Sequence, residues 1–139
     1  MKTYATQIEI DATHDRVWHA LTHDMPRAPI PYGILRFEGT IAPGAKIKLW
    51  SEVTPKRAYA LRVTTFDANR VMVWRGGMPL GLFVGTRTFT ITPTANGSRF
   101  QMREVFSGPL AELITRSMPD LTRSFTKFAT ALKKEAEKE

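Results

Sequence analysis

No cysteine occurs anywhere in the 139 residues. The chain therefore forms no disulfide and offers no thiolate as a metal ligand or nucleophile. It also lacks a run of the roughly 20 apolar residues that a membrane-spanning helix needs. Its first residues, "MKTYATQIEID", lack the apolar core of a secretory signal. From these absences we expect a cytoplasmic protein without integral membrane association.

Signatures of several catalytic and nucleic-acid-binding classes are missing as well. The chain carries no phosphate-binding loop, no nucleophile elbow, and no zinc-finger or RNP-type pattern. Its formal net charge is +7, from 20 basic and 13 acidic residues, but the basic residues are scattered singly along the sequence. Nucleic-acid binding needs basic side chains gathered on one face. We therefore interpret the charge as solvated surface and expect no nucleic-acid partner.

Length and composition are typical of one globular domain, and we expect a single ligand-binding domain over residues 1–139. A short helix is predicted after Thr13, a residue type that caps helix N-termini. Alternation of apolar and polar residues predicts antiparallel strands. The predicted strands are residues 3–11, 34–41, 46–53, 57–67 and 70–76, followed by a hairpin within residues 85–108.

The C-terminal region carries a helical stripe of apolar residues spaced three and four apart. Pro119 interrupts the helix pattern, and Ser117 with Asp120 resembles a capping box, so the helix is expected to kink or restart there. Its apolar face needs a partner, and one face of the sheet is the only large candidate. The stripe consists of Ile114, Met118, Leu121, Phe125, Phe128 and Leu132.

The hairpin "GTRTFTITPTANGSRFQMREVFSG" places two charges on an apolar face. Alternation puts Arg87 beside Phe89, and Glu104 beside Phe106. A two-residue turn at Asn96-Gly97 would set Arg87 opposite Phe106, whereas a four-residue loop would set it opposite Glu104. An unpaired charge there would be costly, so either register favours an Arg87–Glu104 ion pair. The pair could anchor a ligand, or the two charges could serve only to neutralise each other in the fold.

A possible metal-ligand pattern occurs in the first helix. Asp15, His19 and His23 are spaced four apart and share one helix face. Because no fourth ligand accompanies them, we interpret this face as solvated and expect neither a metal nor another cofactor.

Five segments in order resemble the START/birch-pollen-allergen superfamily of helix-grip proteins (SRPBCC), in its polyketide cyclase/dehydrase and lipid-transport-like branch. They are "IEIDATHDRVWHAL", "APGAKIKL", "VMVWRGG", "GTRTFTITP" and "REVFSGPL". The resemblance covers nearly the whole chain. It implies an α+β helix-grip fold: a curved antiparallel sheet of about seven strands around a long C-terminal helix, with two short helices after the first strand. Related sequences often carry His where this chain has Arg87, and a Pro-Trp-type motif where it has "MPRAPIPYG".

The resemblance also implies a cavity between sheet and C-terminal helix, and hence binding of a small, largely hydrophobic molecule for carriage or sensing. An enzyme of the cyclase, dehydratase or aromatase type, using Arg87 and Glu104, is the alternative. A protein- or membrane-interaction module is the second alternative. The expected ligand-binding residues are Arg87, Glu104, Phe89, Trp74, Tyr59, Phe83, Phe106, Met118, Leu121 and Phe125.

Overall fold

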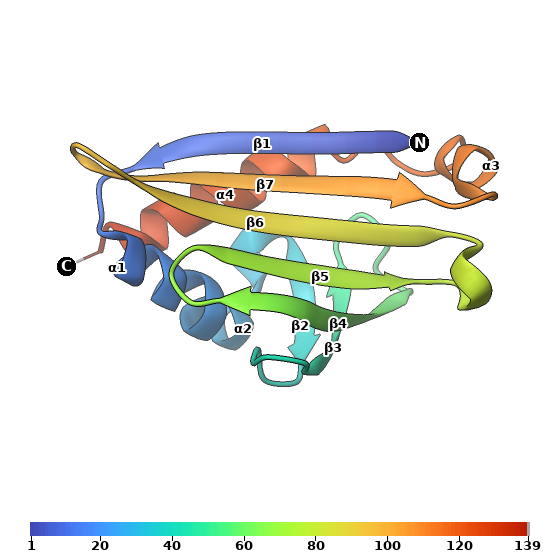
Figure 1. Cartoon of the computed structure of the whole chain (residues 1–139), viewed down its shortest axis with the longest axis horizontal. Coiled ribbons are helices and arrows are strands. Elements are labelled where there is room, and N and C mark those ends of the chain that lie inside the picture. Colours follow the sequence, from blue (N-terminus) through green and yellow to red (C-terminus); the bar gives the residue numbers. More distant parts are fainter. Residues whose placement is uncertain (139) are drawn as a thin grey trace.

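The computed structural model describes residues 1–138, and its main element is one curved antiparallel sheet of seven strands (Figure 1). The strands lie in the order β1-β7-β6-β5-β4-β3-β2, so each strand from β2 to β7 pairs with its neighbour in sequence. The alternating pattern predicted all of them. Their bounds are β1 (Lys2–Ile10), β2 (Ile34–Glu38), β3 (Lys46–Ser51), β4 (Ala58–Asp67), β5 (Val71–Gly77), β6 (Val84–Thr94) and β7 (Gly97–Ser107).

Short helical segments follow β1, and the longest helix ends the chain. Thr13 occupies the N-cap position of the first helix, but its side chain makes no capping hydrogen bond, so the predicted cap is wrong in that detail. The helical elements are α1 (His14–His19), the π-helix η1 (Ala20–Asp24), α2 (Met25–Arg27), the 3-10 helices η2 (Ile30–Tyr32) and η3 (Pro79–Gly81), α3 (Ala111–Thr115) and α4 (Thr122–Ala136).

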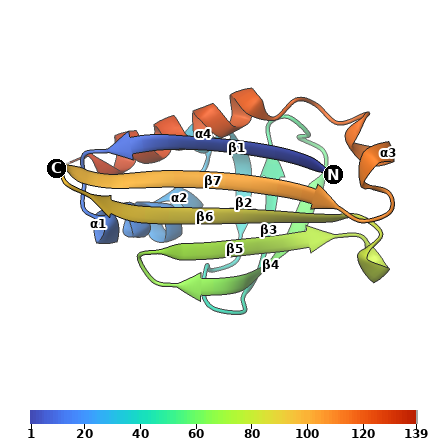
Figure 2. The ribbon, with the colours of Figure 1, turned by 45° about the horizontal axis from the view of Figure 1, so that its top comes forward.

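The C-terminal stripe is divided between two helices, as the break at Pro119 predicted. The predicted capping box is wrong. The hydroxyl of Ser117 donates to the carbonyl of Ile114, while the carboxylate of Asp120 accepts the backbone N–H of Thr122 at 2.9 Å. Leu121 occupies the N-cap position of α4, and the carboxylate of the preceding Asp120 accepts the first N–H of the helix. Figure 2 shows α4 running along β1.

The hairpin between β6 and β7 turns one residue earlier than an Asn96-Gly97 turn would. Thr94 pairs with Gly97, which leaves Ala95 and Asn96 at the turn. Gly97 lies close to the end of the neighbouring strand β1, because a Cβ on Gly97 would lie 2.3 Å from the carbonyl oxygen of Ile10. Glycine is required there by close packing against the end of β1. Of the two registers predicted, the one that sets Arg87 opposite Glu104 is observed.

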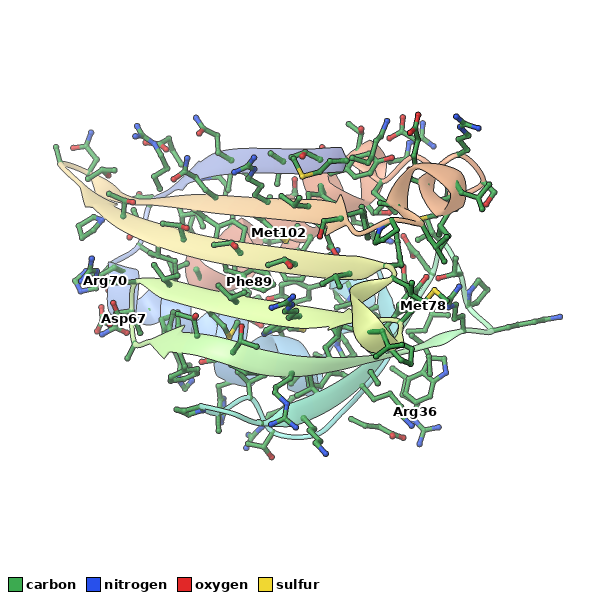
Figure 3. All side chains as sticks on the ribbon, turned by 45° about the vertical axis from the view of Figure 1, so that its right-hand side comes forward. Arg36, Asp67, Arg70, Met78, Phe89 and Met102 are labelled. Carbon is green, nitrogen blue, oxygen red and sulfur yellow. The ribbon has the colours of Figure 1, made fainter. Side chains whose placement is uncertain are left out.

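The sheet has two ends that are packed differently. The closed end holds α1, the β6–β7 turn and the β4–β5 turn, and the open end holds the N-terminus, η3 and α3 (Figure 1). Figure 3 shows Asp67 and Arg70 at the closed end and Met78 at the open end. Between them, Phe89, Phe100 and Phe128 pack ring against ring and are at most 2% exposed.

The architecture is the predicted α+β helix grip, with a curved sheet packed on a C-terminal helix. Within residues 1–138, none of the helices combines the length and the apolar character that crossing a membrane requires.

Candidate functional site

One row of neighbouring side chains crosses four strands on the inner face of the sheet. Tyr4 of β1 pairs with Glu104 of β7, which pairs with Arg87 of β6, which pairs with Trp74 of β5. Paired positions in antiparallel strands place their side chains on the same face, close together. The row separates the aromatic core at Phe89 from the open end.

Arg87 and Glu104 form the predicted ion pair, called the polar pair below. Nε and Nη2 of Arg87 both lie 2.6 Å from Oε1 of Glu104. The guanidinium also lies over the ring of Phe125 of α4, 4.9 Å from its centroid. The side chains are 22% and 13% exposed. Solvent therefore reaches a charged pair on the inner face of the sheet, which a fully packed core would exclude.

Glycine at position 85 makes room for the carboxylate. A Cβ on this residue would lie 2.9 Å from Oε2 of Glu104 and 3.3 Å from the ring of Phe106. Since both donors from Arg87 contact Oε1, Oε2 is the oxygen left to accept a proton or hydrogen bond from a bound molecule.

Aromatic rings surround the polar pair toward the open end. Phe83 stacks on Phe106 with parallel rings at 5.6 Å, and Phe106 meets Tyr4 edge to face at 6.4 Å. Tyr4 in turn packs against Phe125 at 5.9 Å. These rings make the surroundings of the two charges apolar, and Phe106 and Phe125 among them are buried, at 6% and 2% exposed.

The indole of Trp74 completes the site. Its side chain is 1% exposed, and Nε1 is buried without a hydrogen-bond partner among the residues that the structure describes. An unpaired buried N–H costs stability. The hydroxyl of Tyr32, packed against Phe128, is the other such group in the described chain. Burial raises the pKa of Tyr32, and the carboxylates of Glu135 and Asp24 add to the effect.

Six of the ten expected ligand-binding residues come together at this site: Arg87, Glu104, Trp74, Phe83, Phe106 and Phe125. The ring of Phe89 lies 4.7 Å from that of Trp74, and both are buried, at 0% and 1% exposed; Phe89 lies farther from the polar pair, in the aromatic core.

Three expected residues have no recorded contact with the polar pair. Tyr59 belongs to β4 and bonds through its hydroxyl to Thr54 at 2.9 Å. Met118 and Leu121 are half-buried in the segment around the break between α3 and α4. Their role in binding stays a prediction.

Sequence reasoning missed two aromatic residues of this region. Tyr4 pairs directly with Glu104, and Phe37 packs against Trp74 at 6.1 Å. The signal for Tyr4 was present, because alternation puts it on the same face as Ile8 and Ile10. The alternation of β2 did not predict the contact of Phe37 with Trp74, because that contact depends on the curvature of the sheet.

Two hollows on the protein surface lie elsewhere. One is lined by His14 together with residues 68–71 and 90–93, at the closed end. The other lies on the sheet beside Gln7, Thr88 and Gln101. Neither is lined by Arg87 or Glu104. The site at the polar pair is therefore defined by its partly exposed charges and the aromatic rings around them.

Asp15, His19 and His23, predicted to share a solvated helix face, are all exposed. His19 and His23 also lie close to Asp24, and the donor atoms of these three residues lie within 4.8 Å of one another. Asp15 interacts locally, and a hydrogen bond from Thr13 lowers the pKa of its carboxyl.

Comparison with known proteins agrees with this architecture. The family model described as "Polyketide cyclase / dehydrase and lipid transport" matches residues 1–137. No curated protein matches the chain.

Several solved structures share the fold at low identity. Protein MLL2253 from Mesorhizobium loti is 16% identical with a TM-score of 0.73, the match covering 96% of each chain. Protein jhp0584 from Helicobacter pylori is 11% identical with a TM-score of 0.77, over 98% of this chain and 88% of that one. Norcoclaurine synthase from Thalictrum flavum is 15% identical with a TM-score of 0.69, over 99% and 94%. With its family model matched from end to end and its helix-grip fold, the chain belongs to the polyketide cyclase/dehydrase and lipid transport family.

Proposed function

We propose that the protein binds a small, largely hydrophobic molecule between the sheet and α4 at the open end, with the polar pair as its anchor. The observation that carries the proposal is the partial exposure of Arg87 and Glu104 on an otherwise apolar inner face. Charges on an apolar face are costly to desolvate, and their partial exposure leaves them within reach of the polar group of a ligand.

The site suggests the chemical character of the ligand. The polar pair is surrounded by the rings of Phe83, Phe106, Tyr4 and Phe125, an apolar environment that suits an aromatic or acyl body. The free donors of Arg87 suit a carbonyl or carboxylate oxygen. Oε2 of Glu104 suits a hydroxyl group. The ligand class is thus an apolar molecule with one oxygen-bearing polar end.

An enzyme of the cyclase, dehydratase or aromatase type is the second candidate. A guanidinium 2.6 Å from a carboxylate supports it, because Arg87 could polarise a ligand carbonyl while Glu104 moves a proton on the neighbouring carbon. The family description names cyclases and dehydrases, and one neighbour in fold is named a synthase.

Native mass spectrometry of freshly purified, untagged protein tests the binding proposal. We expect a co-purifying small molecule, or saturable uptake from a panel of aromatic and long-chain carboxylic acids and their methyl esters. Bound ligand should raise the melting temperature. Recovery of the compound unchanged after incubation supports carriage, and a changed mass supports the enzyme.

The double variant Arg87→Met with Glu104→Leu should fold but lose at least tenfold in affinity for the acids. The matched control is Arg99→Met with Glu9→Leu, which removes an exposed ion pair from the same sheet. Equal affinity of the two double variants for the acids would refute the anchor. No uptake of any compound by the wild-type protein would instead favour an interaction module, for which Leu80 and Leu113, 96% and 65% exposed, are the candidate contacts.

A further inference from the structure

A second group of chemistry-bearing side chains lies far from the polar pair, on the surface of the helical segment after β1. Nδ1 of His23 lies 3.2 Å, and Nε2 of His19 lies 3.6 Å, from Oδ1 of Asp24. The imidazole rings of the two histidines are stacked at 4.4 Å. A metal ion bonded at about 2.0–2.2 Å to each ligand needs its donor atoms roughly 3–3.5 Å apart. Both distances to the carboxylate are already close to that spacing.

The π-helix η1 is what brings the three residues together. In an α-helix, residues five apart are rotated by about 140° from one another and face different directions. Here the N–H of Met25 donates to the carbonyl of Ala20, five residues back. The wider turn places Asp24 under His19 as well as beside His23. Single π-turns inside helices are frequent at functional sites.

Arg16 orients the carboxylate. Its Nη1 donates to Oδ2 of Asp24 at 3.1 Å, and its Nη2 donates to the carbonyl of Glu135 in α4 at 2.9 Å. Oδ1 is thereby left facing the histidines. Burial opposes ionisation of Asp24, but hydrogen bonds from His23 and Arg16 outweigh it and lower the pKa of the carboxyl. Metal ligands are commonly held by such outer contacts.

We propose that His19, His23 and Asp24 bind one divalent transition-metal ion of the zinc class. Two imidazole nitrogens and one carboxylate oxygen are the ligand types that zinc, nickel and copper prefer, while magnesium and calcium prefer oxygen ligands alone. The imidazoles are 55% and 44% exposed, so an ion reaches them from solvent and keeps water at its remaining positions. Because Asp24 is tied through Arg16 to α4, the bound ion also stabilises the packing of η1 on that helix.

Isothermal titration of zinc chloride into untagged, chelator-treated full-length protein at pH 7.5 tests this site. We expect one ion per chain and a higher melting temperature with zinc. His19→Gln and His23→Gln should each weaken binding at least tenfold, and calcium chloride should not bind. His14→Gln is the matched control, since it removes the third histidine of the chain from the same helical region without touching the cluster.

All three histidine side chains are at least partly exposed, so these variants are expected to keep the wild-type circular dichroism spectrum and to report on binding alone. Zinc binding of equal strength in the His19→Gln/His23→Gln double variant would overturn the proposal. Loss of binding in His14→Gln, or no heat of binding in the wild-type protein at millimolar zinc, would also overturn it.

Discussion

The same strands, with the same alternation of apolar and polar residues, run from the closed end of the sheet to the open end. The side chains at the two ends nevertheless differ in how completely they are buried. At the closed end Leu21, Met72 and Leu132 are fully buried. At the open end Arg87 and Glu104 keep contact with solvent, and Leu80 of η3 is almost wholly exposed. Side chains are therefore packed more tightly at the closed end than around the polar pair and η3.

The difference originates in residue choice along each strand. On β6, Phe89 and Ile91 point into the closed half and fill it. Two and four residues earlier, the same strand carries Arg87 and Gly85. A charge and a missing side chain replace two apolar groups, so this part of the inner face cannot close as a dry core.

The largest effect is expected in the aromatic core between the two ends. Phe128→Ala should lower the free energy of unfolding by about 3–5 kcal/mol, because it removes a ring that packs against Phe89, Phe100 and Tyr32. Chemical denaturation measures the loss. A cost below about 1 kcal/mol would mean that this aromatic core is not the most stable part of the molecule.

The polar pair should respond next. Arg87→Met or Glu104→Leu alone leaves one charge without its partner, and each should cost about 2–4 kcal/mol. The double variant should recover much of the loss, with an interaction energy above about 1 kcal/mol in a double-mutant cycle. Simple addition of two small losses would show that solvent already screens the pair, as it does for surface ion pairs.

A smaller, opposite effect is expected at the tip of the open end. Leu80 has a left-handed backbone with φ of +61°, a conformation that costs a side-chain-bearing residue energy, and it is 96% exposed. Leu80→Gly should raise the free energy of unfolding by up to about 1 kcal/mol. Destabilisation by this variant would reveal a folding role for Leu80 and weaken its assignment as an exposed contact residue.

The smallest effect concerns the cap that starts α4 at the open end. The N–H of Thr122 lowers the pKa of the Asp120 carboxyl. A lowered pKa in the folded state stabilises the protein fully above the ordinary aspartate value of about 3.9 and loses that stabilisation as the pH falls through the folded-state value. Asp120→Ala should therefore be slightly less stable than wild type at pH 7, and the difference should close as the pH falls through the lowered folded-state pKa of this carboxyl.

Asp120→Asn separates the cap from the charge, because an asparagine side chain also accepts the Thr122 N–H. Its stability relative to Asp120→Ala should not depend on pH. A difference between wild type and Asp120→Ala that stays constant from pH 7 to pH 2 would contradict the assignment.

Much of the fold was predictable because the strand sequences alternate apolar and polar residues with a period of two. The position of the polar pair on the inner face follows from that alternation alone. The register was not predictable, because Asn96-Gly97 is a strong turn signal and the demand on Gly97 comes from Ile10, far away in sequence.

The metal-ligand cluster shows a different limit. With 3.6 residues per turn, Asp15 is expected on the same helix face as the two histidines. The π-turn instead brings Asp24 close to them. Nothing in local composition distinguishes the two cases, since the π-turn forms where the helical segment packs against α4. The indole N–H of Trp74, buried without a partner among the described residues, is also a result of packing, and the alternation of the strand does not predict it.

Nuclear magnetic resonance of the three tryptophan indole N–H groups locates a bound ligand relative to the polar pair. Trp74 pairs with Arg87 across the sheet, Trp18 packs against Phe66 at the closed end, and Trp50 lies beside Arg36. On titration with a saturating aromatic or long-chain carboxylic acid that the protein takes up, we expect a large shift of the Trp74 signal and little change in that of Trp18. A shift confined to Trp18 or Trp50 would contradict a binding site at the open end.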